Sequence, residues 1–80
     1  MWYVYIVRCA DNTLYTGVTT DIARRLREHN GEVRRGARYT KLKRPVALVY
    51  IETIDTRSQA LKREAAIKQL SKQQKECLIG

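Results

Sequence analysis

The stretch YVYIVRCADNTLYTGVTTDIARRLREHN, residues 3–30, decides the fold of this chain. Residues 2–9 are β-branched and aromatic almost throughout, which predicts a strand that is covered on both faces. A turn signal at residues 10–12 separates it from a second strand-like run at residues 13–19. Strands joined by so short a link must run antiparallel, so the stretch begins with a β-hairpin.

The residues that follow the hairpin predict a helix and a third strand. Thr20-Asp21 suits a helix N-terminus, and Asn30-Gly31 suits the end of the same helix. Residues 46–53 have the composition of a strand, and Pro45 stands at its opening, where proline is tolerated. The sequence leaves open which strand of the hairpin lies beside this third strand.

Two further helices complete the expected fold, one near residues 57–70 and a short one at residues 71–79. The order β-β-α-β-α with a short C-terminal helix predicts one small α+β domain over residues 1–80. In that domain, helices flank a three-stranded antiparallel sheet. A chain of this length buries only about 60–65% of its unfolded surface, so we expect a thin core.

The charge of the chain is strongly positive and unevenly distributed. Sixteen Lys and Arg against eight Asp and Glu give a net charge of +8. Residues 33–51 contain no acidic residue, and six cations crowd into this stretch: Arg34, Arg35, Arg38, Lys41, Lys43 and Arg44. A solvated basic loop is one reading of such a run, but on so short and basic a chain it predicts a polyanion partner. The run has no amphipathic apolar face, which argues against a membrane surface.

Nothing in the sequence suggests export, a membrane span or a zinc site. No apolar run approaches the ~18 residues that a membrane helix needs, and we expect an intracellular, cytoplasmic protein. Cys9 and Cys77 form no C-x-x-C pair, and the single His29 cannot complete a zinc site with them. We expect Cys9 to be a core residue and Cys77 to be partly buried.

Glu64 stands where packing alone predicts an apolar residue. At 100° per residue, it falls within the apolar arc of the second helix, which is formed by Ala60, Leu61, Ile67 and Leu70. A carboxylate in such an arc is costly unless it is paired or holds a metal ion. A structural ion pair with an arginine is the alternative to a functional role.

Three residues near the hairpin also invite a functional reading. Arg25 and His29 are four residues apart and share one helix face, and Arg25 adjoins the core residue Leu26. We therefore expect Arg25 to emerge near the sheet, although a solvated Arg/His edge is the alternative. Gly17 lies inside the second strand, where glycine indicates a bulge or a close approach by another backbone or a ligand.

Together, these residues resemble the signature of the GIY-YIG nuclease domain. The resemblance rests on Tyr3-Val4-Tyr5, Tyr15-Thr16-Gly17, Arg25 and Glu64, and it covers essentially the whole chain. The stretches GARYTKLKRPVALVY and ALKREAAIK look most like the small stand-alone bacterial members of the family. Tyr3 stands where the motif has its first glycine, and Lys75 and Glu76 offer no equivalent of a late asparagine found in some members.

The resemblance implies a catalytic site and a role for each residue in it. Its catalytic residues would be Tyr5, Tyr15, Arg25, His29 and Glu64, with Gly17 as the motif glycine. Glu64 would hold one Mg²⁺ or Mn²⁺, and Arg25 would clamp the phosphate. Tyr5 would be the base, its pKa lowered by Arg25 and the metal, with Tyr15 nearby. His29 would accept the proton or orient Tyr15, and the sequence does not decide between the two.

The implied function is metal-dependent hydrolysis of DNA phosphodiester bonds. The basic residues from Arg34 to Arg44 would contact the DNA backbone, so we expect structure selectivity or little sequence specificity. DNA repair or recombination is a fitting setting, RNA is not excluded as a substrate, and a larger protein partner would supply targeting. The alternative is a nucleic-acid-binding module whose nuclease site is weak or vestigial.

Overall fold

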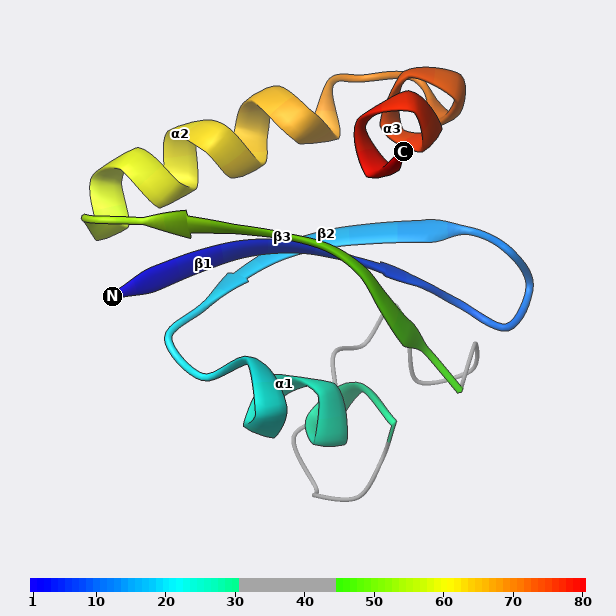
Figure 1. Cartoon of the computed structure of the whole chain (residues 1–80), viewed down its shortest axis with the longest axis horizontal. Helices are drawn as coiled ribbons and strands as arrows, with labels where there is room; N and C mark the ends of the chain where they lie inside the picture. The colour runs from blue at the N-terminus through cyan, green and yellow to red at the C-terminus, as the bar shows by residue number, and fades with distance from the viewer. Residues whose placement is uncertain (31–44) are drawn as a thin grey trace.

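The computed structural model describes residues 1–30 and 45–80 of the chain, and it contains three strands and three helices (Figure 1). In chain order these are β1 (Trp2–Arg8), β2 (Leu14–Thr19), α1 (Ile22–His29), β3 (Ala47–Ile54), α2 (Arg57–Lys68) and α3 (Lys72–Ile79). The predicted α+β class and the predicted element order are confirmed. None of the described helices is long and apolar enough to cross a membrane.

The sheet is antiparallel and has the strand order β2-β1-β3. The third strand therefore lies beside the first strand of the hairpin, which settles the pairing that the sequence left open. Tyr5 is paired with Gly17 on one side and with Ile51 on the other, so it occupies the middle of the sheet. A register shift between Ile6 and Val7 interrupts the pairing of β1 with β3.

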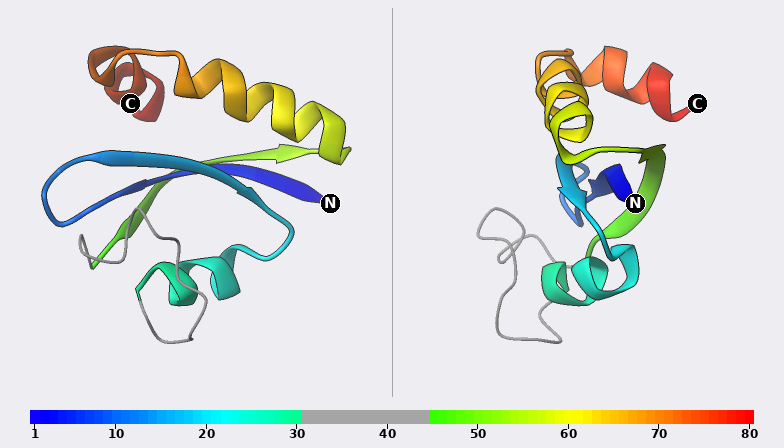
Figure 2. Two further views of the ribbon diagram at one scale, coloured as in Figure 1. Left: turned by 180° about the vertical axis from the view of Figure 1, so that it is seen from behind. Right: turned by 90° about the vertical axis from the view of Figure 1, so that its left-hand side faces the viewer.

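Helices cover both faces of this sheet, with α2 and α3 on one face and α1 on the other (Figures 1 and 2). Because successive side chains of a strand point to opposite faces, β1 contributes to two separate cores. Val4 and Ile6 pack with residues of α2, whereas Tyr5 and Val7 belong to the cluster that Leu26 of α1 packs against. A single central strand thus supplies the interior of both layers.

The residues that cap α1 are the ones that the sequence predicted. The Asp21 side chain accepts a hydrogen bond from the backbone N–H of Arg24 at 3.0 Å, and Asn30 is the C-terminal cap. The Asn30 side chain also bonds to Val46, accepting from its N–H at 2.7 Å and donating to its carbonyl at 3.3 Å. The end of α1 is thereby attached to the chain just before β3.

The C-terminal helices differ from the expectation in three details. The second helix ends at Lys68 rather than near residue 70. Leu61 was expected on the apolar face of this helix, but it is 37% exposed, and Ala60 and Ile67 are the buried members. Cys77 is exposed rather than partly buried. Leu78 and Ile79 do pack against the core, as their apolar character requires.

Candidate active site

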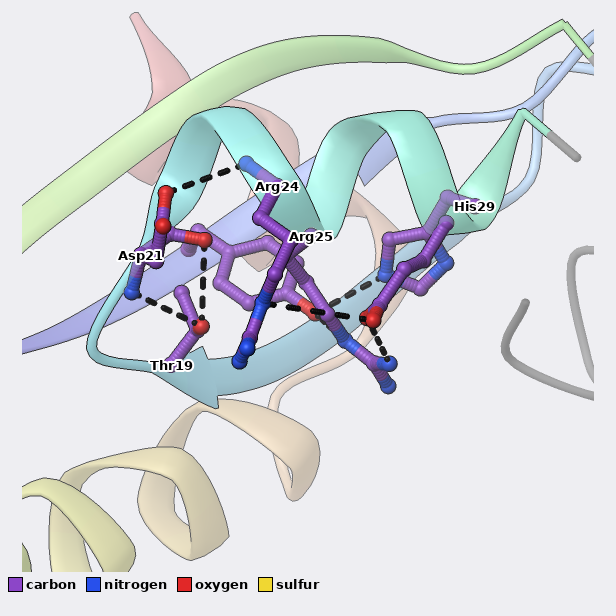
Figure 3. A network of polar contacts seen from close by, with 7 residues as sticks. Thr19, Asp21, Arg24, Arg25 and His29 are labelled. Atoms are coloured by element: carbon purple, nitrogen blue, oxygen red, sulfur yellow. Dashed lines mark hydrogen bonds and ion pairs between the residues drawn. The ribbon is translucent and has the colours of Figure 1, made fainter. Parts of the chain in front are cut away.

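The Tyr5 hydroxyl is the point at which the site is assembled. Tyr5 is 1% exposed, and its hydroxyl lies 2.8 Å from Nε2 of His29. The Nε–H group of Arg25 donates to the same hydroxyl at 3.2 Å, as the close view of α1 shows (Figure 3). Three of the five predicted catalytic residues, one from β1 and two from α1, therefore meet at a single phenol.

His29 is fully buried, and its environment favours the neutral ring. Burial, helped by the positive charge of Arg25, lowers its pKa from 6.5 to about 4. The ring is therefore neutral at pH 7, and one of its two nitrogens carries no proton and can accept a hydrogen bond. Since Arg25 can only donate to the phenol, the buried Tyr5 proton requires an acceptor, and Nε2 of His29 is in position to accept it.

Burial also dominates the ionisation of Tyr5. It raises the pKa of the phenol to about 12, although the hydrogen bond and the charge of Arg25 act in the opposite direction. Arg25 thus acts in the expected direction, but desolvation outweighs it. From the sequence, Arg25 and a metal ion were expected to lower the pKa of this phenol. The protein groups alone do not lower it.

Gly17 leaves room for the Tyr5 ring on the neighbouring strand. A Cβ atom at position 17 would lie 2.5 Å from the Tyr5 hydroxyl oxygen and 2.7 Å from Cζ. The close approach that the glycine indicated is present, but the approaching group is a side chain of β1 rather than another backbone or a ligand. The strand register that places Tyr5 opposite Gly17 explains why a larger residue does not fit there.

Glu28 belongs to the site, and the sequence reasoning missed it. Its carboxylate accepts from Nη1 of Arg25 at 3.0 Å, so Arg25 is held at one end by Tyr5 and at the other by Glu28. Burial disfavours the charged guanidinium, but these two hydrogen bonds raise its pKa further above its ordinary value. The i,i+3 spacing of Arg25 and Glu28 is the signal that could have identified the pair.

Tyr15 joins the same cluster from β2. Its ring lies edge-on to the His29 ring, with 5.1 Å between the ring centroids and 67° between the planes. The Tyr5 ring meets His29 in a similar way, at 5.8 Å and 66°. The two predicted tyrosines therefore flank one imidazole, and Tyr15 is the more exposed of them.

Glu64 lies on α2, which covers the face of the sheet opposite α1 (Figure 1). Its side chain is 20% exposed, and its carboxylate lies 3.5 Å from the ammonium of Lys68. The structural alternative named an arginine as the partner, which is wrong: Arg63 instead pairs with Glu52 of β3. The negative charge of Glu64 raises the pKa of Tyr5, and it is the smallest of the named influences on that pKa.

The carboxylate of Glu64 fits a hydrated hard cation better than a fully protein-bound metal. Across residues 1–30 and 45–80 there is no group of three His, Cys, Asp or Glu side chains able to share a metal ion. A single carboxylate leaves most coordination positions to water, which suits Mg²⁺ and not a structural zinc ion. The ammonium of Lys68 is the group that such a cation would have to displace.

The sequence also singled out the basic run and Glu76. The six cations of the basic run, Arg34, Arg35, Arg38, Lys41, Lys43 and Arg44, lie outside the described residues. Glu76, which offered no equivalent of the late asparagine, forms a bidentate ion pair with Arg8, at 2.5 and 2.7 Å. That pair attaches α3 to the end of β1.

Comparisons with known proteins agree with this fold. The family model described as "GIY-YIG catalytic domain" matches residues 1–76. A UPF0213 protein of Desulfotalea psychrophila is 63% identical over 98% of this chain and 70% of its own length. Another, of Halobacterium salinarum, is 50% identical over 99% of this chain and its full length. The solution structure of the UPF0213 protein of Bacillus halodurans matches with a TM-score of 0.62 and 39% identity, over 99% of this chain and 83% of that one.

Proposed function

Because this chain belongs to the GIY-YIG catalytic domain family, a family of nucleases, we propose that it is an endonuclease that hydrolyses DNA phosphodiester bonds with a divalent cation. One observation carries the proposal: the phenol of Tyr5 is bonded to both His29 and Arg25, two residues of the predicted catalytic set. Binding of a nucleic acid alone does not require Tyr5, Tyr15, Arg25 and Glu64 in combination.

Arg25 is suited to hold the phosphate that is cut. Tyr5 and Glu28 fix its side chain from two directions, yet 27% of it remains exposed to solvent. The guanidinium stays charged at every relevant pH, and its planar donors match phosphate oxygens. An orientation fixed before binding reduces the entropy lost when the phosphate docks.

His29 and Tyr5 form the route by which a proton leaves the attacking water. The phenol oxygen accepts the proton of the water while its own proton passes to Nε2 of His29, so the phenol is never ionised. The high pKa of Tyr5 is then no obstacle. A phosphate bound at Arg25 adds negative charge beside His29, which raises the pKa of the imidazole in the complex. Tyr15 is the second phenol that can meet the water.

Glu64 is the residue that would hold the cation. When bound there, a hydrated Mg²⁺ or Mn²⁺ supplies positive charge to the phosphate and the leaving oxygen. The side chain of Glu64 is 20% exposed, so a cation held there would stay in contact with water.

Binding of the DNA backbone falls to the basic residues between 34 and 44, together with the net charge of +8. Backbone contacts position DNA without reading its sequence, so the proposed enzyme selects DNA by structure or has little sequence specificity. DNA repair or recombination is the proposed setting. Affinity should fall ~10³-fold between 50 and 200 mM salt if about six phosphates are contacted. A larger protein partner would supply targeting, and RNA is an alternative substrate to be tested alongside DNA.

The decisive experiment compares cleavage of plasmid and branched DNA by the wild type, Glu64→Gln and Arg25→Ala in Mg²⁺ or Mn²⁺. Each substitution should lower the cleavage rate at least 10²-fold, since each removes a group that stabilises charge in the transition state. Lys62→Met serves as a control because Lys62 is an exposed residue of the same helix. Equal cleavage by all variants would reveal a contaminating nuclease. Tight binding without cleavage by the wild type would favour the binding-module alternative.

A further inference from the structure

Lys68 is placed at Glu64 in a way that the proposed chemistry does not yet use. It is the last residue of α2 and lies one helical turn after Glu64, with 3.5 Å between Nζ and Oε2. Its side chain is 52% exposed, whereas that of Glu64 is 20% exposed. A solvent-exposed ammonium is therefore paired with the less exposed carboxylate that is the candidate cation ligand.

Two other cations of α2, Arg63 and Lys62, do not take this position. Arg63 is turned towards β3, where it forms a bidentate pair with Glu52 at 2.8 to 3.0 Å. Lys62 is exposed and has no ion pair within the described part of the chain. An ordinary i,i+4 pair on a helix surface contributes only a few tenths of a kcal/mol, so stability gives little reason for the contact.

We propose that Lys68 is a positioning residue that neutralises Glu64 until the cation binds and then turns to a phosphate of the bound DNA. This inference rests on the proposed function. An ammonium and a divalent cation cannot share one carboxylate oxygen without strong repulsion, so binding of the cation releases Lys68. The lysine stem is flexible and largely solvated, so the move costs little.

The released ammonium has a clear destination. DNA brings negatively charged phosphates to the protein, and lysine binds phosphate as a point charge. Lys68 would thereby exchange a carboxylate for a phosphate when both the cation and DNA are present. Two opposite effects follow from removing its charge: tighter binding of the cation, and weaker binding of DNA only when the cation is present.

The first test measures binding of Mn²⁺ to the DNA-free protein, by the loss of the electron paramagnetic resonance signal of the free ion. Lys68→Met keeps the aliphatic stem and should bind Mn²⁺ three- to tenfold more tightly than the wild type. Lys62→Met, the matched control, should bind as the wild type does, and Glu64→Gln should not bind. Equal affinity in Lys68→Met and the wild type, with binding lost in Glu64→Gln, would overturn the inference and leave the proposed function standing. Undiminished binding by Glu64→Gln would instead remove the cation from Glu64 and contradict the proposed function.

The second test counts phosphate contacts from the salt dependence of DNA binding. It uses Tyr5→Phe as the parent, which slows cleavage but keeps Arg25 in place to hold the phosphate, and compares it with Tyr5→Phe/Lys68→Met. In Mn²⁺ the slope of log affinity against log salt should be shallower by about 0.9 without Lys68, and in EDTA the two slopes should agree. A difference of the same size in EDTA would mean that Lys68 contacts DNA without any exchange, and the inference would fail.

Discussion

The two faces of the sheet differ in what they bury. Towards α2 and α3, the central strand presents Val4 and Ile6, which pack with Ala60 and Ile67 in a fully buried apolar cluster. Towards α1, the same strand presents Tyr5, which is buried against the imidazole of His29. Both faces bury apolar side chains, but the face towards α1 also buries a phenol hydrogen-bonded to an imidazole. Because successive side chains of β1 point to opposite faces, this one strand supplies the interior of both layers of a thin domain.

The largest effect is expected on the apolar face. Ile67→Ala removes a fully buried side chain of α2, and the cavity and lost burial should lower the free energy of unfolding by about 2–5 kcal/mol. Urea unfolding followed by circular dichroism measures it. Leu61→Ala, on an exposed position of the same helix, should cost less than about 1 kcal/mol. A loss below 1 kcal/mol for Ile67→Ala would mean that this face does not carry the stability.

The opposite face should respond in activity more than in stability. Tyr5→Phe keeps the ring over Gly17 but removes the hydroxyl that His29 and Arg25 share. We expect cleavage to fall about 10²-fold or more, because the proton route is broken, and the free energy of unfolding to fall by only about 1–3 kcal/mol. Tyr15→Phe is the comparison in the same assay. Full activity in Tyr5→Phe together with a loss in Tyr15→Phe would transfer the role of base to Tyr15.

The titration of His29 should show how polar the α1 face is. It is the only histidine, so its ring resonances are unambiguous in a proton NMR titration. A pKa of about 4 in the folded protein lies below the ordinary value of 6.5, so between these values the unfolded chain binds a proton that the folded chain does not. Stability from this residue is therefore complete above pH 6.5 and is lost as the pH falls towards 4.

The matching stability measurement compares the wild type with His29→Gln between pH 5 and 6.5. In this range the carboxyls of Glu52 and Glu76, whose pKa values are lowered by hydrogen bonds from their arginine partners, stay ionised and do not contribute. The wild type should lose stability as the pH falls, and the variant should not. An observed His29 pKa near 6.5 would show that the imidazole is solvated and would remove the contrast between the two faces.

The sequence predicted the apolar face and the element order well, because both depend on local patterns. Caps such as Asp21 and the β-branched run of β1 act over a few residues, and the structure confirms what they indicated. The site was harder to predict, since burial decides its electrostatics. Nothing in the sequence near Tyr5 shows that desolvation outweighs Arg25 and raises the pKa of the phenol. That balance depends on how α1 closes over the sheet.

The ion-pair partners of Glu64 and Arg25 could not be chosen from the sequence either. Lys68 and Glu28 stand at helical spacings of four and three residues from them, so both pairs were visible in the sequence. Every charged residue on a helix has several such neighbours, however, and spacing alone does not choose among them. Tertiary contacts make the choice: Glu52 on β3 takes Arg63, and Glu64 is left to Lys68.

The smallest predicted effect concerns a polar group on the apolar face. Thr16 is 3% exposed, lies opposite Ile6 in the sheet, and has no hydrogen-bond partner for its hydroxyl in the described structure. A buried hydroxyl without a partner is destabilising, so Thr16→Val should raise the free energy of unfolding by about 1 kcal/mol. Thr19→Val is the matched control: the Thr19 hydroxyl is bonded to the backbone of Asp21 at the start of α1, and its loss should lower stability by a similar amount. Urea unfolding of the two variants should thus give opposite signs. A loss in both would mean that the hydroxyl of Thr16 has a hydrogen-bond partner in solution. The face towards α2 would then also bury a satisfied polar group, and the contrast between the two faces would be smaller.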